Sequence, residues 1–351
     1  MEHSQTNCAI ILAGGEGKRM KSNRPKVLSS VLFKPMLRWV MDAALEAGLQ
    51  RLCVVAGFQH ETVEDYLAQV CMEGLDMKLS VALQLERKGT AHAVQMADSF
   101  LQENRGGNVL ILNGDAPFLS PAVIQEALAQ HVAQKNAVTV ISAELEHPFG
   151  YGRIVRDPQA GTLQAIVEEK DADTAVKQIQ EVNSGAYWFR VDDLLSVLYQ
   201  IGNQNAQGEY YLPDAVSLLL KQGKRADAFA TSDANTVLGA NDCLQLNQLN
   251  TIARRQLLEK HMAAGVEIPC QDGVILGPDV TIGAHTCILP GTILQGRTQI
   301  GSGCRIGAHT QLENVVVEDG LTLASVFAQN CTITESPAPF TAMGKPAPAH
   351  P

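Results

Sequence analysis

Long apolar runs are missing from this chain. None approaches the roughly 20 residues that a membrane-spanning helix needs. The first apolar stretch, Cys8–Ala13, is too short for the core of a signal peptide and is followed by glycines instead of a cleavage site. We therefore expect a cytoplasmic protein that does not act at a membrane.

Paired cysteines are missing too. The chain has eight cysteines, and no two of them form the CxxC pair that is typical of a zinc site. In a reducing cytosol, scattered cysteines are usually small buried residues or bystanders. This pattern speaks against a zinc protein and against a catalytic thiol.

Positive charge is scarce. Lys and Arg number 27 against 37 Asp and Glu, so the formal net charge is −10. This balance argues against nucleic acid as a partner. The mean field of the protein would also repel a nucleotide, so phosphate binding has to come from a local group of cations together with a metal ion.

Apolar residues are plentiful, at 46% of the 351 residues, and they follow two patterns. In residues 1–240, short apolar runs alternate with helical segments such as Pro35–Ala47. Buried strands are predicted at Cys8–Ala13, Leu52–Ala56, Val109–Leu112 and Ala137–Ser142. This alternation predicts an α/β, Rossmann-like domain with a mixed, mostly parallel sheet, in which ligands bind at the carboxyl ends of strands.

The second pattern is a six-residue repeat. Aliphatic residues recur at Leu276, Ile282, Ile288, Leu294, Ile300, Ile306 and Leu312. Small or β-branched residues stand two positions before them, at Val274, Val280, Thr286, Thr292, Thr298, Cys304 and Thr310. This repeat predicts a parallel β-helix of roughly three to four coils, because the rhythm breaks after Leu312. We expect a linker helix over residues 241–265, the β-helix over 266–334 and a Pro/Ala-rich tail over 335–351.

A glycine-rich segment, LAGGEGKRM, follows the first predicted strand at Leu12–Met20. It is neither a P-loop, because Arg19 stands where Ser or Thr is required, nor a dinucleotide fingerprint, because Met20 replaces the last glycine. Glycines at a strand end let backbone N–H groups approach phosphate oxygens. With Lys18, Arg19 and Lys26 nearby, a polyphosphate explains the segment better than a plain turn does.

Two further segments carry candidate chemistry. Asp115 follows the strand Val109–Leu112, where a carboxylate is well placed to hold Mg²⁺ against substrate phosphates, although a turn aspartate is the simpler alternative. Lys88-Gly89-Thr90 reads as a helix N-terminus with Thr90 as its cap, and Gly89 would also let a planar ring approach. We assign His92 no role.

Taken in order, nine motifs resemble those of the bacterial N-acetylglucosamine-1-phosphate uridylyltransferases, over about residues 8–330. The motifs are LAGGEGKRM, RPKVL, LERKGTAHA, NGDAP, GYGRI, IVEEKDA, EVNSGAY, GEYYLPDA and GANDCLQL. The resemblance implies a Mg²⁺-dependent enzyme of cell-wall precursor synthesis that joins UTP to N-acetylglucosamine 1-phosphate and releases pyrophosphate. It also implies a left-handed β-helix and a homotrimer formed through the faces of that helix.

The resemblance also implies residue roles. Phosphate contacts would come from Leu12, Ala13, Gly14 and Gly15, and charge neutralisation from the catalytic Arg19 and Lys26. The uracil would be recognised by Gln84, Gly89 and Thr90, and the ribose side of the site bordered by Asn113 and Gly114. The acetylated sugar would be held by Gly152, Glu168 and Asn183, and Mg²⁺ by Asp115 and Asn241.

The chain departs from that family in two respects. Lys18 stands where the family usually has Thr, and Gly14 where Ala is common. The later coils that carry the acetyl-transfer histidine of the familiar bifunctional enzyme have no counterpart, so we expect no acetyltransferase activity and interpret His285 and His309 as surface residues. The alternatives are the same chemistry on another sugar phosphate or with dTTP, and a non-catalytic scaffold that binds UDP-sugars.

Overall fold

A computed structural model describes residues 6–336, apart from the side chain of Lys18. The chain forms two compact units. The first contains the described residues up to Ser29 and those from Pro35 to Leu246, and the second contains Ser30–Lys34 and the described residues from Asn247 onward. All but two residues of the tail predicted at 335–351 lie outside the described residues.

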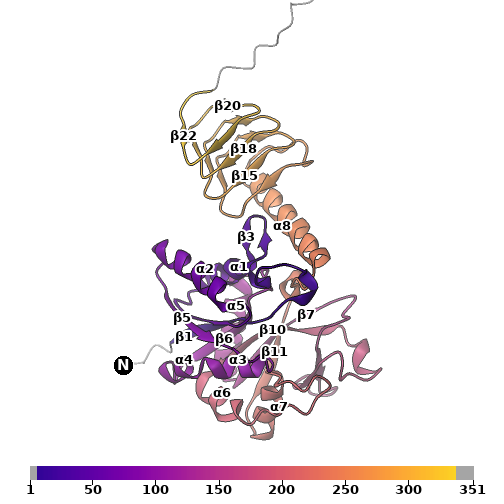
Figure 1. The fold of residues 1–351 in the computed structure, drawn as a ribbon. Coiled ribbons are helices and arrows are strands. Elements are labelled where there is room, and N and C mark those ends of the chain that lie inside the picture. Colours follow the sequence, from indigo (N-terminus) through magenta and orange to yellow (C-terminus); the bar gives the residue numbers. More distant parts are fainter. Residues whose placement is uncertain (1–5, 337–351) are drawn as a thin grey trace, which may run out of the picture. The chain divides into compact units, whose positions relative to one another are not determined.

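The first unit is built on a nine-stranded mixed sheet (Figure 1). Its strands are β1 (Asn7–Ala13), β4 (Arg51–Ala56), β5 (Lys78–Leu83), β6 (Asn108–Asn113), β7 (Val138–Glu144), β8 (Arg153–Arg156), β9 (Leu163–Val167), β10 (Glu181–Arg190) and β11 (Ala226–Thr231). The order is β11-β7-β10-β6-β1-β4-β5, and β10 runs antiparallel to β6, β7 and β8. The expected mixed, mostly parallel sheet is confirmed.

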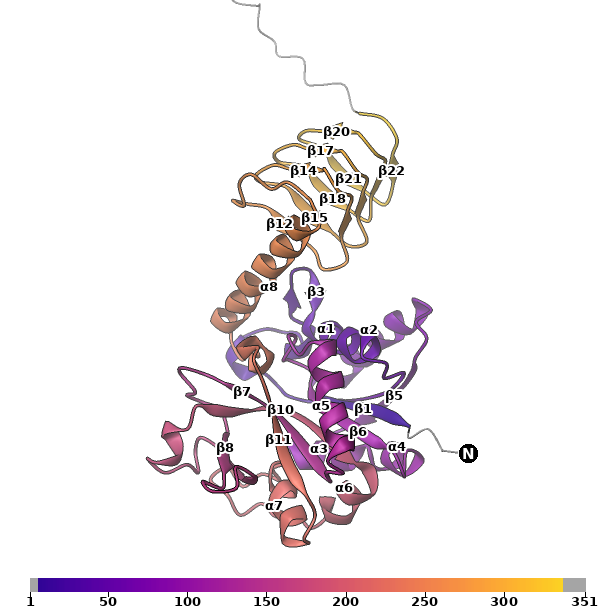
Figure 2. The same cartoon turned by 180° about the vertical axis from the view of Figure 1, so that it is seen from behind.

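Helices cover both faces of this sheet (Figure 2). One face packs against α1 (Met36–Glu46), α2 (His60–Met72) and α5 (Pro121–Ala133). The other packs against α3 (Thr90–Met96), α4 (Asp98–Glu103), α6 (Val191–Leu198) and α7 (Asp214–Lys221). Strand β1 is apolar on both sides because both of its faces are buried: Ala9 and Ile11 pack in one core, while Cys8 and Ile10 pack in the other.

The four predicted strands are present, and each observed strand begins or ends within two residues of the predicted bounds. The predicted helix 241–265 corresponds to α8 (Cys243–Ala263), along which the division between the two units falls at Leu246. Within residues 6–336, no helix is long and apolar enough to cross a membrane.

The second unit contains the β-helix. Its strands are β12 (Ile275–Leu276), β13 (Thr281–Ile282), β14 (Cys287–Ile288), β15 (Ile293–Gln295), β16 (Gln299–Ile300), β17 (Arg305–Ile306), β18 (Gln311–Glu313), β19 (Val316–Val317), β20 (Thr322–Leu323), β21 (Phe327–Gln329) and β22 (Thr332–Ile333). They stack as three parallel sheets, β12-β15-β18-β21, β13-β16-β19-β22 and β14-β17-β20. The remaining elements of the unit include β2 (Ser30–Val31), which pairs with β3 (Lys34–Pro35).

The repeat explains this architecture. Aliphatic residues such as Leu294 and Ile306 are fully buried and pack on one another between coils. Where the six-residue spacing breaks after Leu312, the coil is one residue shorter, so Ile300 pairs with Val317 and not with Glu318. Glycine is required at Gly301 and Gly307 because a Cβ there would come within 3 Å of the backbone of the next coil.

Candidate functional site

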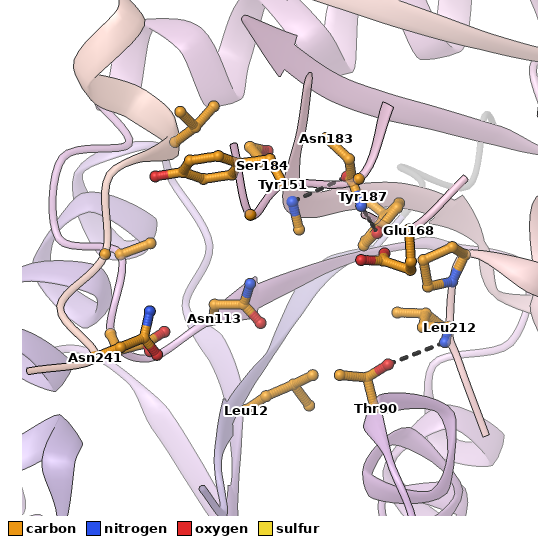
Figure 3. A pocket seen from close by; sticks show the side chains of 18 of the residues that line it. Leu12, Thr90, Asn113, Tyr151, Glu168, Asn183, Ser184, Tyr187, Leu212 and Asn241 are labelled. Atoms are coloured by element: carbon orange, nitrogen blue, oxygen red, sulfur yellow. Dashed lines mark hydrogen bonds between the residues drawn. The ribbon is translucent and has the colours of Figure 1, made fainter. Parts of the chain in front are cut away.

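Two adjoining cavities open at the carboxyl ends of β1 and β6, and both are lined by the first unit alone. The first has a volume of about 500 Å³ and is bordered by the glycine-rich segment, Gln84 and Gly89. The second has a volume of about 420 Å³ and is bordered by Glu168, which follows β9, by residues of β10 and by the segment before α8 (Figure 3). The residues common to both are Leu12, Thr90, Asn113 and Asp115.

This arrangement collects most of the residues singled out from the sequence. Those in the first cavity are Gly14, Gly15, Lys26, Gln84 and Gly89, and those in the second are Arg19, Gly152, Glu168, Asn183 and Asn241. Ala13 and Gly114 line neither: Ala13 is buried in β1, and the N–H of Gly114 donates to the carbonyl of Leu12 at 2.9 Å. Their substrate contacts, like those of the others, stay predictions.

A cluster of charged and polar groups lies where the two cavities meet. The ammonium group of Lys26 forms an ion pair with the Asp115 carboxylate and donates a hydrogen bond of 2.9 Å to Oδ1 of Asn241. The three residues come from positions far apart in the chain, yet their side chains converge on one point. Both side chains of the ion pair are largely shielded from water, with exposed fractions of 12% for Lys26 and 22% for Asp115.

Close backbone packing holds this cluster. Gly17 adopts a φ of +62°, and a Cβ at that position would lie 2.7 Å from Cβ of Lys26. A Cβ on Gly239 would lie 3.0 Å from the carbonyl oxygen of Asp115, which also accepts a hydrogen bond of 3.4 Å from Ala240. The glycine-rich segment and the segment that leads into α8 are therefore both packed against the residues they position.

The same cluster suits a divalent cation. Asp115 and Asn241 already direct two oxygen atoms at one cation, the ammonium group of Lys26. Carboxylate and amide oxygens are ligands for Mg²⁺, which is commonly held by one or two carboxylates plus substrate phosphates. Among residues 6–336 there is no group of three or more His, Cys, Asp or Glu side chains that could hold a metal by themselves. The residues therefore fit a metal that is shared with a bound phosphate.

The first cavity contains one correction to the sequence analysis. Thr90 is the first residue of α3 and does not cap it: its hydroxyl accepts the N–H of Leu212 at 3.0 Å. Gly89 precedes the helix with a φ of +110°. A Cβ on Gly89 would lie 2.5 Å from the carbonyl oxygen of Tyr210, so glycine is needed for this close backbone approach. Gly89 also lines the first cavity, and its contact with a planar ring stays a prediction.

The second cavity is built around a bulge in β10. The pairing of β10 with β7 shifts between Asn183 and Ala186, which turns the side chains of this segment into the cavity (Figure 3). Asn183 donates to the hydroxyl of Tyr187 at 2.6 Å and accepts the N–H of Gly185 at 2.9 Å. Its amide is thus oriented before any ligand enters.

Glu168 contributes the carboxylate of the second cavity. A Cβ on Gly152 would lie 3.0 Å from Oε1 of Glu168, so a larger residue at position 152 would crowd this carboxylate. Burial, reinforced by the negative charges of Asp171 and Asp214, raises the pKa of Glu168 above its ordinary value, while Arg153 acts in the opposite direction. The group is therefore more readily protonated than an exposed glutamate.

Sequence reasoning missed several residues that line these cavities. Tyr151 and Tyr187 border the second cavity, and burial raises the pKa of each, so both carry neutral hydroxyls. Arg87 borders the first cavity, where its guanidinium is 2.5 Å from the Glu16 carboxylate. Tyr187 follows Asn183 by four residues on the same strand, and nothing in the sequence indicates that a bulge brings the two side chains together.

Comparison with known proteins matches each of the two units to a family profile. The profile described as "Nucleotidyl transferase" matches residues 8–246, and that described as "Bacterial transferase hexapeptide (six repeats)" matches residues 279–314. Proteins named "Bifunctional protein GlmU" are similar over most of the chain. That of Caldanaerobacter subterraneus subsp. tengcongensis is 41% identical over 89% of this chain and 66% of its own length. That of Thermoanaerobacter pseudethanolicus is 40% identical over 90% of this chain and 66% of its own length. That of Halalkalibacterium halodurans is 38% identical over 95% of this chain and 71% of its own length.

Proposed function

Because the chain belongs to the nucleotidyl transferase family, we propose that it transfers the uridylyl group of UTP to N-acetylglucosamine 1-phosphate. Similarity to proteins named GlmU and the order of the motifs support this choice of substrates. The chain spans 66% of the length of the first two relatives described above. We therefore propose only the uridylyl transfer for it, and not every activity of those bifunctional proteins. The observation that carries the proposal is the Lys26, Asp115 and Asn241 cluster, which lies where two cavities meet.

The two cavities divide the substrates between them. The nucleotide occupies the first, with its base near Gln84 and its phosphates along the glycine-rich segment. The sugar occupies the second, where Glu168 and Asn183 offer hydrogen-bonding groups and Gly152 leaves room for the ring. The phosphate of the sugar and the α-phosphate of the nucleotide then meet beside Asp115, which both cavities share.

The reaction is an in-line displacement. An oxygen of the sugar phosphate forms a bond to the α-phosphorus, and the bond from that phosphorus to the bridging oxygen breaks, so pyrophosphate leaves with the electron pair. The nucleophile is already ionised, so no general base is needed. Alignment of the two phosphates in adjoining cavities contributes to the rate by making the step effectively unimolecular.

Charge neutralisation is the main task of the protein, because two anions must meet. Lys26 and Arg19 supply positive charge toward the α-phosphate and the leaving group. Asp115 and Asn241 would hold Mg²⁺, which supplies Lewis-acid stabilisation of phosphoryl oxygens. Lys26 holds these two oxygen ligands together in the protein alone, so its ammonium must turn toward the phosphates when they bind.

Release of pyrophosphate tests the proposal. We expect Mg²⁺-dependent release with UTP and N-acetylglucosamine 1-phosphate that exceeds release with other nucleotides and sugar phosphates. The Asp115→Ala variant is expected to lose turnover while its thermal melting stays close to that of the parent. Asp65→Ala, which alters an exposed carboxylate on α2, is the matched control and is expected to keep activity.

The other outcomes separate the alternatives. Faster release with another sugar 1-phosphate or with dTTP would reassign the substrates but keep the chemistry. Binding of UDP-sugars without Mg²⁺-dependent turnover would make the chain a scaffold. The expected lack of acetyltransferase activity stays a prediction, which release of free thiol from acetyl-CoA checks.

A further inference from the structure

His92 has no role in the function proposed above, yet it contacts Gln84, the residue beside which that function places the base. It lies on α3, and its Nδ1 is 3.2 Å from Nε2 of Gln84. The same Nε2 donates to the carbonyl oxygen of Gly89 at 3.0 Å. Gln84 is only 5% exposed and borders the first cavity, so its amide is held on one side and accessible to a ligand on the other.

These contacts determine which way round the Gln84 amide lies. The carbonyl of Gly89 can only accept a hydrogen bond, so the group facing it must be the NH₂ of Gln84. That NH₂ also faces Nδ1 of His92, which must therefore carry a lone pair, with the ring proton on Nε2. The remaining atom of the amide, Oε1, points away from both partners.

The carbonyl oxygen of Gln84 lies against the glycine-rich segment. A Cβ on Gly14 would lie only 2.8 Å from Oε1 of Gln84, which places this oxygen beside the Cα of Gly14. Both residues line the first cavity. The backbone of Gln84 is fixed as well, because its N–H donates to the carbonyl of Ala56 at 2.7 Å. The cavity therefore presents a hydrogen-bond acceptor at this point, and a flip of the amide would present a donor.

We propose that His92 is a positioning residue for base selectivity: His92 and the Gly89 carbonyl together engage both N–H groups of the Gln84 amide and so hold its carbonyl toward the base. Uracil carries a hydrogen on N3 and can donate it to this oxygen. Cytosine has a lone pair on N3, so it would leave the Gln84 acceptor without a partner and bring two acceptors together. An unpaired buried polar group is costly, which makes such a contact selective.

This inference rests on the proposed function only for its choice of nucleotides. Two measurements distinguish a failure of the proposed function from a failure of the role proposed for His92. The first is equilibrium binding of UTP and CTP, which needs no turnover. The second is kcat/KM for pyrophosphate release with each nucleotide. Absence of turnover with every nucleotide would end the proposed function, whereas the binding measurement would still decide the role of His92.

The variants are His92→Leu, which removes the acceptor, and His92→Asn, which keeps an amide oxygen near the place of Nδ1. We expect His92→Leu to lower the preference for UTP over CTP at least tenfold, mainly through KM and binding affinity and much less through kcat. We expect His92→Asn to retain most of the preference. Loss of helix packing alone would affect UTP and CTP equally, so the ratio separates positioning from a structural role.

A double-variant cycle makes the test specific to the amide. In a Gln84→Ala background no amide remains to be oriented, so His92→Leu should change the UTP/CTP ratio by less than twofold there. The proposal is overturned if His92→Leu alone keeps the parent ratio. It is also overturned if His92→Leu lowers the ratio equally with and without Gln84, or if His92→Asn behaves like His92→Leu.

Discussion

At the scale of single residues, the ammonium group of Lys26 takes the place between Asp115 and Asn241 that suits a divalent cation. We predict that Lys26→Ala lowers kcat about 10²–10³-fold, the usual cost of removing one group that stabilises charge in the transition state. Steady-state pyrophosphate release measures this effect. Lys26→Arg keeps the charge and should lose less, and a variant that altered only UTP affinity would contradict the assigned role.

A second prediction at this scale concerns Glu168. Burial raises its pKa in the folded protein, so between its ordinary pKa and the raised value the folded state binds more protons than the unfolded state. The stability contributed by the protonated form is therefore present at low pH and is lost as pH rises through the folded pKa. Glu168→Gln, which carries no charge, should melt at a higher temperature than the parent at neutral pH.

Thermal melts of parent and Glu168→Gln across the acid range measure this difference. It should shrink as pH falls toward the ordinary pKa of a glutamate, because both side chains are then neutral. A difference that is constant with pH would show that Glu168 is not destabilised by its own charge. The same variant should bind the sugar phosphate more weakly, because an acceptor-only carboxylate becomes an amide.

At the scale of elements, threonines that occupy the same position in the hexapeptide repeat differ in their hydrogen bonding. The hydroxyl of Thr298 donates to the carbonyl of Gln295 at 2.7 Å, and that of Thr292 donates to the carbonyl of Leu289 at 2.7 Å. The hydroxyl of Thr310 is equally buried but finds no partner among the described residues. Identical residues at equivalent positions thus differ in whether their buried hydroxyl is hydrogen-bonded.

We therefore predict that Thr298→Val destabilises the protein by about 1–3 kcal/mol, because it removes the hydrogen bond to Gln295 and leaves the N–H of Val315 without the hydroxyl oxygen that accepts it. Thr310→Val, the matched control, should be neutral or stabilising, because it replaces an unpaired buried hydroxyl by a methyl group. Urea unfolding followed by circular dichroism measures both. Equal destabilisation by the two substitutions would contradict the difference in hydrogen bonding.

Element by element, the fold was largely predictable. Strands such as β1 and β6 are apolar throughout, which is the local sign of burial on both faces, and the β-helix follows from a repeat that needs no long-range information. The wrong assignment was Thr90, whose hydroxyl was expected to cap α3 and instead binds Leu212. A residue 122 positions away decided that contact, and no local pattern reports it.

At the scale of the whole molecule, the hexapeptide repeats support the predicted homotrimer. We expect sedimentation equilibrium to give a mass three times the 37.7 kDa of the chain. Phe327 lies on β21 with 68% of its surface exposed, so Phe327→Asp should lower this mass if the faces of the β-helix associate. Met72→Asp, at a position on α2 with 82% of its surface exposed, is the control, and a monomeric parent would contradict the prediction.

The sequence by itself determined the two architectures and the segments that carry the site, because both follow from periodicities and turn residues that act over a few positions. Only the tertiary structure decided which atoms meet: Lys26 with Asp115 and Asn241, Asn183 with Tyr187 at a bulge, and His92 with the amide of Gln84. The physical reason is that such contacts depend on how strands and helices pack after they form. The direction in which one amide points is set by its neighbours in space, and the chain sequence does not report those neighbours.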